Sequence, residues 1–224
     1  MVMDIHSHTY YSNCGADDPR VIIENAISGG IELFGITDHN HGIGGRKKEY
    51  FDLLTSLRDE YADRIRILRG IEIATLVPFD LARNEDVSMF DYCLVEHIDR
   101  PGTTVGMKIF DYAHHLGCRV GIAHTDLIGM AEANDISPLL FLRRFAAAGI
   151  FWEMNVNYDS VHSWQEHDYV LRFCNSPREQ ELVRKSGIKI SVGFDGHRSE
   201  DYSPERVKKM CRFLESRDIP LVQF

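Results

Sequence analysis

Short apolar runs alternate with segments of helical periodicity along the whole chain. Each run suits a buried strand, and each following segment carries apolar residues at the spacing of a helix face. The expected strands are residues 2–8, 31–40, 65–74, 90–98, 118–126, 150–157 and 188–197. The expected helices are residues 17–30, 49–64, 105–117, 137–149, 176–187 and 203–218, and residues 219–224 form an extra strand or a tail.

Start and stop signals support these helices. Asp17 or Asp18 caps the first one and Pro19 begins it, while Ser137 is the expected cap of the helix at 137–149. The alternation gives about seven βα units, which predicts an α/β fold with a TIM-barrel-like (β/α) barrel. An open doubly wound sheet is the structural alternative.

Composition narrows the class of protein. The chain has 224 residues, of which 44% are hydrophobic and 26% charged, as in one globular domain spanning 1–224. Its formal net charge of −9 argues against nucleic acid as a partner. The five cysteines form no CxxC pair, and we find neither a signal-peptide pattern nor an apolar run of membrane-spanning length. We therefore expect a cytoplasmic protein without a membrane partner.

Polar residues gather where the expected strands end. His6 and His8 are two apart in the first strand, so their side chains share one face. The carboxyl ends of parallel barrel strands meet at one rim, where active sites of such folds lie. His114, His115, His162 and His167 are interpreted as surface residues. The strand-end set comprises His6, His8, Asp38, His39, Glu72, His97, His124, Asp195 and His197, with Glu153, Asn155 and Asn157 along the sixth strand.

So many imidazoles and carboxylates on one rim predict a metal centre. Without an ion, buried polar groups and charges would be left unsatisfied. The donors suit zinc, manganese or iron, and the lack of thiolate clusters disfavours a structural zinc site. They exceed what one ion can bind, so two or three divalent ions with Glu72 as a bridge fit better. Such a centre favours hydrolysis of a phosphate ester, with amide or lactone hydrolysis as the rival.

Six motifs resemble a known family. In order they read "DIHSHT", "ITDHN", "GIE", "VEH", "IAHTD" and "GFDGH", and they run from Asp4 to His197. This ordered set is similar to the successive motifs of the PHP (polymerase and histidinol phosphatase) family. The resemblance implies a distorted seven-stranded (β/α) barrel, a di- or trinuclear centre and a metal-dependent phosphoesterase, that is, a hydrolase.

The resemblance also implies roles for individual residues. His6, His8, Glu72 and Asp195 would bind one ion, and Glu72 would bridge to a second ion held by His97 and His124. His39 and His197 would belong to a third ion, and a hydroxide between ions would attack phosphorus. Asp38, Glu72 and Asp195 are the expected catalytic carboxylates; Asp38 would orient a ligand or handle a proton, or else it only caps the strand end.

One position departs from the family pattern. After "HTYYS" the family usually has an Asp or His that completes the third site, whereas Asn13 and Cys14 stand here. Asn is a poor zinc ligand, and Cys14 could either ligate as thiolate or be an inert small residue. Asp17 and Asp18 lie close by, so the sequence leaves the third site open.

The expected substrate is a small phosphorylated metabolite, as for a histidinol phosphatase. Phosphate needs cationic partners, and Arg198 is the first candidate, followed by Arg100 and Arg46. A metal-dependent amide or lactone hydrolase and a metal-binding module without turnover are the alternatives. The absence of a lysine at a strand end weakens the former.

Overall fold

A single parallel sheet forms the centre of the molecule. The computed structural model describes residues 1–76 and 87–224. Within these residues seven strands follow one another in chain order, and every neighbouring pair is parallel. The strands are β1 (Met3–Asp4), β2 (Leu33–Ile36), β3 (Arg66–Ala74), β4 (Tyr92–Glu96), β5 (Arg119–Ile122), β6 (Phe151–Asn155) and β7 (Ile190–Gly193).

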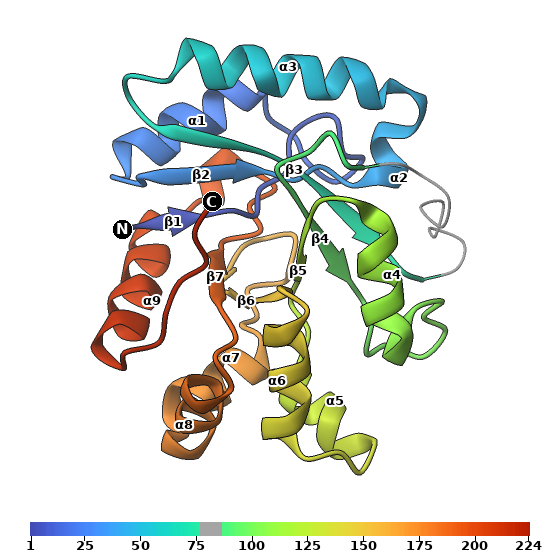
Figure 1. Cartoon of the computed structure of the whole chain (residues 1–224). Coiled ribbons are helices and arrows are strands. Elements are labelled where there is room, and N and C mark those ends of the chain that lie inside the picture. The colour runs from blue at the N-terminus through green and yellow to red at the C-terminus, as the bar shows by residue number, and fades with distance from the viewer. Residues whose placement is uncertain (77–86) are drawn as a thin grey trace.

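The sheet curls until its first and last strands meet (Figure 1). The Ile5 amide donates to the Val192 carbonyl at 3.0 Å, and the Asp195 amide donates to the His6 carbonyl at 2.8 Å. The regular part of β1 is only two residues long, so this seam is short and the barrel is distorted. The alternative of an open doubly wound sheet is wrong, and the expectation of a distorted seven-stranded barrel is confirmed.

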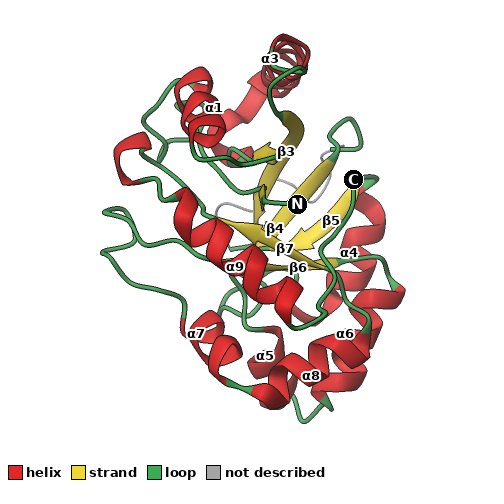
Figure 2. Cartoon of the chain, turned by 90° about the vertical axis from the view of Figure 1, so that its left-hand side faces the viewer, coloured by secondary structure: helices red, strands yellow, loops and turns green. Residues whose placement is uncertain are grey.

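Helices lie around the outside of the strands (Figure 2). None of the helices in the described ranges is long and apolar enough to cross a membrane. They are α1 (Pro19–Ser28), α2 (Asn40–Ile43), α3 (Lys47–Glu60), α4 (Ile109–Leu116), α5 (Leu127–Ala133), α6 (Pro138–Ala147), α7 (Asp168–Asn175), α8 (Pro177–Ser186) and α9 (Pro204–Ser216), with 3-10 turns η1 (Gly44–Arg46), η3 (Gly106–Lys108) and η4 (Ser199–Asp201).

The sequence missed three of these helices. α2 and α5 contain four and seven residues, too few for a periodic pattern to stand out, and α7 begins after His167 without a Ser, Thr, Asp or Asn cap to mark its start. Asp18 and not Asp17 caps α1, accepting a hydrogen bond from the Arg20 amide at 2.8 Å. Ser137 precedes α6 but makes no side-chain cap bond. Residues 219–224 form a tail that meets β7 at one bridge, Leu221 with Ile190.

Side chains fill the barrel interior. The buried Tyr92 hydroxyl in β4 donates to the Ile5 carbonyl at 2.6 Å, which ties β4 to the chain beyond β1. This close approach needs glycine at position 35, because a Cβ there would overlap the Tyr92 hydroxyl. The interior is therefore a packed core, and the cluster of polar side chains described below lies at the rim of the barrel.

A part-buried ion pair lies near the junction of β3 and β4. The Arg69 guanidinium donates to both Asp91 oxygens, at 2.7 and 3.1 Å, and lies 4.5 Å over the Phe51 ring. Burial by itself would raise the pKa of Asp91, but the hydrogen bonds from Arg69 outweigh this effect and hold the pKa below its ordinary value. Such a carboxylate stabilises the fold above its unfolded-state pKa, and the stabilisation is lost as pH falls through the folded-state pKa.

We therefore expect Asp91→Asn to lower the free energy of unfolding by about 1–2 kcal/mol near neutral pH. The difference from the wild type should shrink as the pH falls toward about 4 and below. Urea unfolding across this pH range measures both effects. A deficit that stays constant with pH would contradict the ionic origin of the stabilisation.

Candidate metal centre

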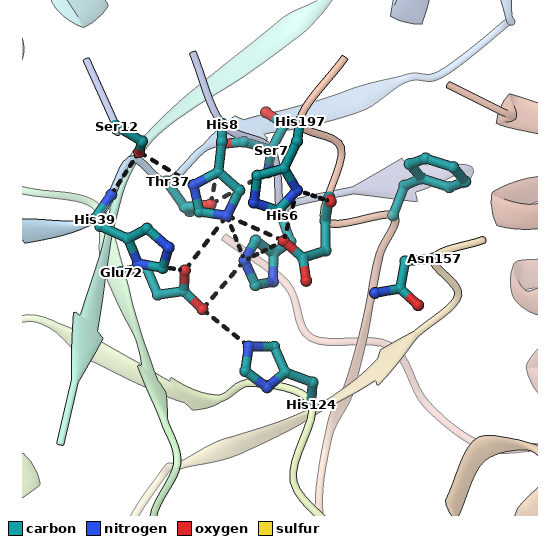
Figure 3. Close-up of polar contacts among 12 residues, drawn as sticks. His6, Ser7, His8, Ser12, Thr37, His39, Glu72, His124, Asn157 and His197 are labelled. Atoms are coloured by element: carbon teal, nitrogen blue, oxygen red, sulfur yellow. Dashed lines mark hydrogen bonds and ion pairs between the residues drawn. The ribbon is translucent and has the colours of Figure 1, made fainter. Parts of the chain in front are cut away.

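The carboxyl ends of the strands bring six imidazoles and two carboxylates to one rim of the barrel. Figure 3 shows His6, His8, His39, His124 and His197 around Glu72. Glu72 lies within β3 itself, whereas the other donors follow the ends of β1, β2, β4, β5 and β7. The rim residues are His6, His8, His39, Glu72, His97, His124, Asp195 and His197.

The Nε2 atoms of His6 and His8 point toward each other. Nδ1 of His6 donates to Glu153 at 2.8 Å. Nδ1 of His8 lies 3.2 Å from the Ser12 hydroxyl, which itself donates to Asp38 and therefore accepts from His8. The two Nε2 atoms are left facing each other at 3.2 Å. Two imidazole nitrogens at this distance need a proton or a cation between them.

Glu72 lies at the middle of the cluster and is fully buried. Its Oε1 is 3.2 Å from His6 Nε2 and 3.3 Å from His124 Nε2. Its Oε2 is 3.0 Å from His39 Nδ1 and has no hydrogen-bond partner among the described residues. Burial alone would raise the pKa of Glu72, but His6 and His39 hold it well below its ordinary value. Glu72 thus carries a negative charge placed to face more than one cation.

Asp195 and His197 complete the cluster from the last strand. Asp195 Oδ1 lies 3.0 Å from His8 Nε2 and 3.3 Å from His6 Nε2. Nδ1 of His197 donates to the Asp195 carbonyl at 2.8 Å, which leaves its Nε2 lone pair free to bind an ion. The His197 ring stacks on His8 with centroids 4.4 Å apart.

Three of the strand-end residues have a left-handed backbone. The φ angles are +64° at His97, +23° at His124 and +56° at Asp195. This conformation is uncommon for residues with a side chain, and it is retained where the surroundings impose it. It ends each strand abruptly and changes the direction in which the side chain leaves the backbone.

Glu96 is a site residue that the sequence reasoning missed. It is 4% exposed, and its carboxylate lies 3.0 Å from His97 Nδ1 and 3.5 Å from His124 Nε2. Neighbouring residues of a strand normally face opposite ways, so Glu96 and His97 should not share a side. The left-handed backbone of His97 breaks that alternation. An acidic residue at the end of the apolar run 92–95 was the available signal.

Glu153 supports the cluster from behind. It is fully buried in β6, accepts from His6 Nδ1, and accepts from the His124 amide at 3.0 Å. Gly193 in β7 makes room for it, because a Cβ there would overlap Glu153 Oε1 and His6 Cβ. A carboxylate in this position fixes the tautomer of the histidine and raises its basicity toward a metal.

Two histidines interpreted as surface residues belong to the site. His162 Nδ1 lies 2.7 Å from Asp159, and its Nε2 lies 3.4 Å from Asp195. The His167 ring stacks on His124 with an interplanar angle of 4°, and burial lowers the pKa of His167 to about 4. Their interpretation was wrong because the loop between β6 and α7 carries no periodicity from which its direction could be predicted. His114 and His115 are exposed, as expected.

Asp38 is buried, and both of its carboxylate oxygens accept hydrogen bonds from the loop of residues 9–12. Its Oδ1 accepts from the Thr9 amide at 2.7 Å, the Ser12 amide at 3.0 Å and the Ser12 hydroxyl at 2.6 Å. Its Oδ2 accepts from the Thr9 hydroxyl at 2.7 Å. The Ser12 hydroxyl in turn accepts from the His39 amide at 2.9 Å. These bonds connect Asp38 to His8 and His39 through Ser12.

The residues at and near the departure from the family pattern occupy different environments. Asn13 is exposed, Asp18 caps α1, and Asp17 accepts from the Ser199 amide at 2.6 Å. Cys14 is part-buried, and its sulfur lies within 4.8 Å of ligand atoms of His8, His39 and His197. Burial, with the charges of Glu72 and Asp195, raises the pKa of the Cys14 thiol to about 12.

The three candidate phosphate-binding arginines are exposed at the rim. Arg46 lies 4.9 Å over the Tyr11 ring, and Arg198 lies 3.9 Å from Glu200. Burial, together with the positive charges of His124 and Arg100, lowers the pKa of His97 to about 4. The Arg100 amide donates to the His97 carbonyl at 3.2 Å, which places this residue next to the cluster in the chain.

The donor set fits divalent metal ions. Among the described residues, Glu72 Oε2, His39 Nδ1 and His97 Nδ1 are buried and make no hydrogen bond, although each lies near a potentially charged group. Sets of at least three donors lie around His6 with His8 and Asp195, and around His6 with Glu72 and His124. Burial by itself would lower the pKa of His6, but Asp195, Glu153 and Glu72 raise it well above the ordinary value. An ion that binds here must displace such protons.

Fold and site together define the chain as a metal-dependent hydrolase built on a parallel βα barrel. Its sequence matches the model of the PHP domain over residues 4–211. The chain belongs to the PHP family, as its motifs indicate.

Two curated relatives align along almost the whole chain. A probable phosphatase of Acetivibrio thermocellus is 25% identical over 98% of this chain and 88% of its own length. A probable phosphatase of Caldanaerobacter subterraneus is also 25% identical, over 98% of this chain and 85% of its own.

Two solved structures share the fold. The histidinol phosphate phosphatase of Lactococcus lactis, crystallised with zinc, L-histidinol and phosphate, has a TM-score of 0.62 at 19% identity and covers 99% of this chain and 96% of its own. The putative histidinol phosphatase of Listeria monocytogenes has a TM-score of 0.54 at 15% identity, over 90% of this chain and 97% of its own.

Proposed function

We propose that the chain hydrolyses a phosphate monoester of a small metabolite at a centre of two or three divalent ions. The observation that carries this proposal is the convergence of His6, His8, Glu72 and Asp195 on one point, with His124 against the same Glu72 oxygen as His6. Zinc, manganese and iron suit these donors. The relatives named as phosphatases and the zinc in the Lactococcus lactis structure support the same proposal.

The contacts support a division of the ligands. His6, His8, Glu72 and Asp195 would hold the first ion, and Glu72, His97 and His124 the second. His39 and His197 would belong to a third. When bound, the ions would make water acidic enough to act as a nucleophile near neutral pH and would withdraw charge from the phosphoryl oxygens.

The protein's own groups position these ligands. Glu153 orients His6, and Asp38 holds the loop of His8 and His39 through Ser12. The bonds of Asp38 favour the orienting role over proton transfer, since both of its oxygens already accept within the loop. Glu72 and Asp195 contribute charge at the reacting atoms.

Substrate contacts and location complete the proposal. Arg198, Arg100 and Arg46, all exposed, are candidate phosphate contacts. A histidinol-phosphate-like ester is the first compound to test, given the structural neighbours. The five free thiols support a reducing compartment such as the cytoplasm.

Metal removal tests the mechanism. Hydrolysis of a generic aryl phosphate should fall by about two orders of magnitude or more after chelation and dialysis, and manganese or zinc should restore it. Protein dialysed without chelator is the control, and a panel of phosphorylated metabolites run on the reloaded enzyme identifies the substrate class. Full activity in protein shown by elemental analysis to hold no metal would refute the proposal.

A further inference from the structure

Asn13 and Cys14 stand where the resemblance to the family implies an Asp or His for a third ion, and the structure separates the two residues. The neighbouring candidates are excluded by their positions. Asn13 is exposed, Asp18 caps α1, and Asp17 is bonded to the Ser199 amide. Cys14 alone among these four residues lies with the histidines, within 4.8 Å of ligand atoms of His8, His39 and His197.

The loop around Cys14 is fixed at both ends to these histidines. On one side, the Ser12 hydroxyl accepts from the His39 amide at 2.9 Å. On the other side, the Ala16 amide donates to the His197 carbonyl at 3.0 Å. The two bonds hold Cys14 between His39 and His197, so its position is set by the same residues that would share an ion with it.

A second, independent feature points to a cation at this place. Glu72 Oε2 belongs to a fully buried side chain and has no hydrogen-bond partner among the described residues. It lies 3.0 Å from His39 Nδ1 and 3.4 Å from His8 Nε2, two of the three histidines around Cys14. A buried carboxylate oxygen that makes no hydrogen bond and lies beside two of the three imidazoles around Cys14 is a group that a cation would satisfy.

We propose that Cys14 is a thiolate ligand of a third ion, together with His39 and His197. The inference rests on the proposed metal centre and concerns its composition. As the bond between Sγ and the ion forms, the thiol proton passes to solvent, so no oxidant or reductant is required. A soft thiolate beside imidazoles favours zinc or iron over manganese, which makes the third site chemically different from the other two.

Cobalt substitution tests the ligation without using activity. Protein loaded with Co²⁺ should show a sulfur-to-cobalt charge-transfer band in the near ultraviolet. Cys14→Ala should abolish the band and lower the bound metal by about one equivalent per chain. Cys14→Asp should also abolish the band but retain the ion, because carboxylate replaces thiolate. Cys174→Ser, which removes a part-buried thiol elsewhere, should change neither.

The outcomes separate this inference from the proposed function. A band that persists in Cys14→Ala, or that disappears in Cys174→Ser, would overturn the ligation, as would equal metal content in wild type and Cys14→Ala. Circular dichroism shows whether each variant is folded, and Cys14→Asp provides the test if the alanine variant is not. A phosphatase with two ions and no band refutes only the Cys14 ligand. A Cys14-dependent band without phosphatase activity refutes only the function.

Discussion

Glu72→Gln should lower kcat/KM for phosphate-ester hydrolysis by at least about 10³-fold. Glu72 is fully buried and lies within 3.4 Å of nitrogens of four histidines, so it would serve two ions at once. Glutamine keeps the size of the side chain but removes its charge and turns one oxygen into a donor. That donor would face imidazole nitrogens which must themselves be free to bind metal.

The measurement combines steady-state kinetics with elemental analysis. Metal content should fall together with activity, while circular dichroism shows an intact fold. Glu132→Gln, at an exposed carboxylate on α5, is the matched control and should behave as the wild type. Turnover close to wild type in a Glu72→Gln protein would show that the centre works without the bridge. A module without turnover would have no rate to lose in either variant.

Asp38→Asn should destabilise the protein by about 2–4 kcal/mol and disturb the metal centre. Four hydrogen bonds converge on this buried carboxylate, all from Thr9 and Ser12. Asparagine removes the charge that strengthens them, and its amide hydrogens must face donors. Because Ser12 also contacts His8 and His39, both metal content and activity should fall.

Thermal unfolding and metal analysis distinguish the two roles considered for Asp38. A residue that only transferred protons would lose activity while the melting temperature and the metal content stayed at wild-type values. That result would exclude the positioning role. Asp52→Asn, at an exposed carboxylate paired with Lys48 on α3, is the control for a simple loss of charge.

The barrel and most of its rim could be predicted from the sequence because both follow from repetition. Seven apolar runs separated by helical segments imply parallel strands, and parallel strands deliver their end residues to one rim. His6, His8, Glu72, His124 and Asp195 meet for that reason. The prediction needed no knowledge of distances, only of strand direction.

The site residues that could not be predicted from the sequence are placed by local backbone geometry. Glu96 lies on the same side as His97 because the left-handed backbone of His97 breaks the strand alternation. The residue types at these positions do not predict that conformation. His162 and His167 reach the site through a loop in which Ser163 and Trp164 also have positive φ. Cys14 is placed by hydrogen bonds from segments far away in the chain.

The seam between β1 and the end of β7 links metal binding to the biosynthesis of the chain. His8 and Asp195 are 187 positions apart, yet their side chains touch, and the backbone bonds of the seam join their immediate neighbours. In a nascent chain on the ribosome, His6 and His8 are synthesised before Glu72, and Asp195 can join them only after β7 has emerged. The first site can therefore be completed only once β7 has been synthesised, and an ion bound before then would be held by His6, His8 and Glu72 without Asp195.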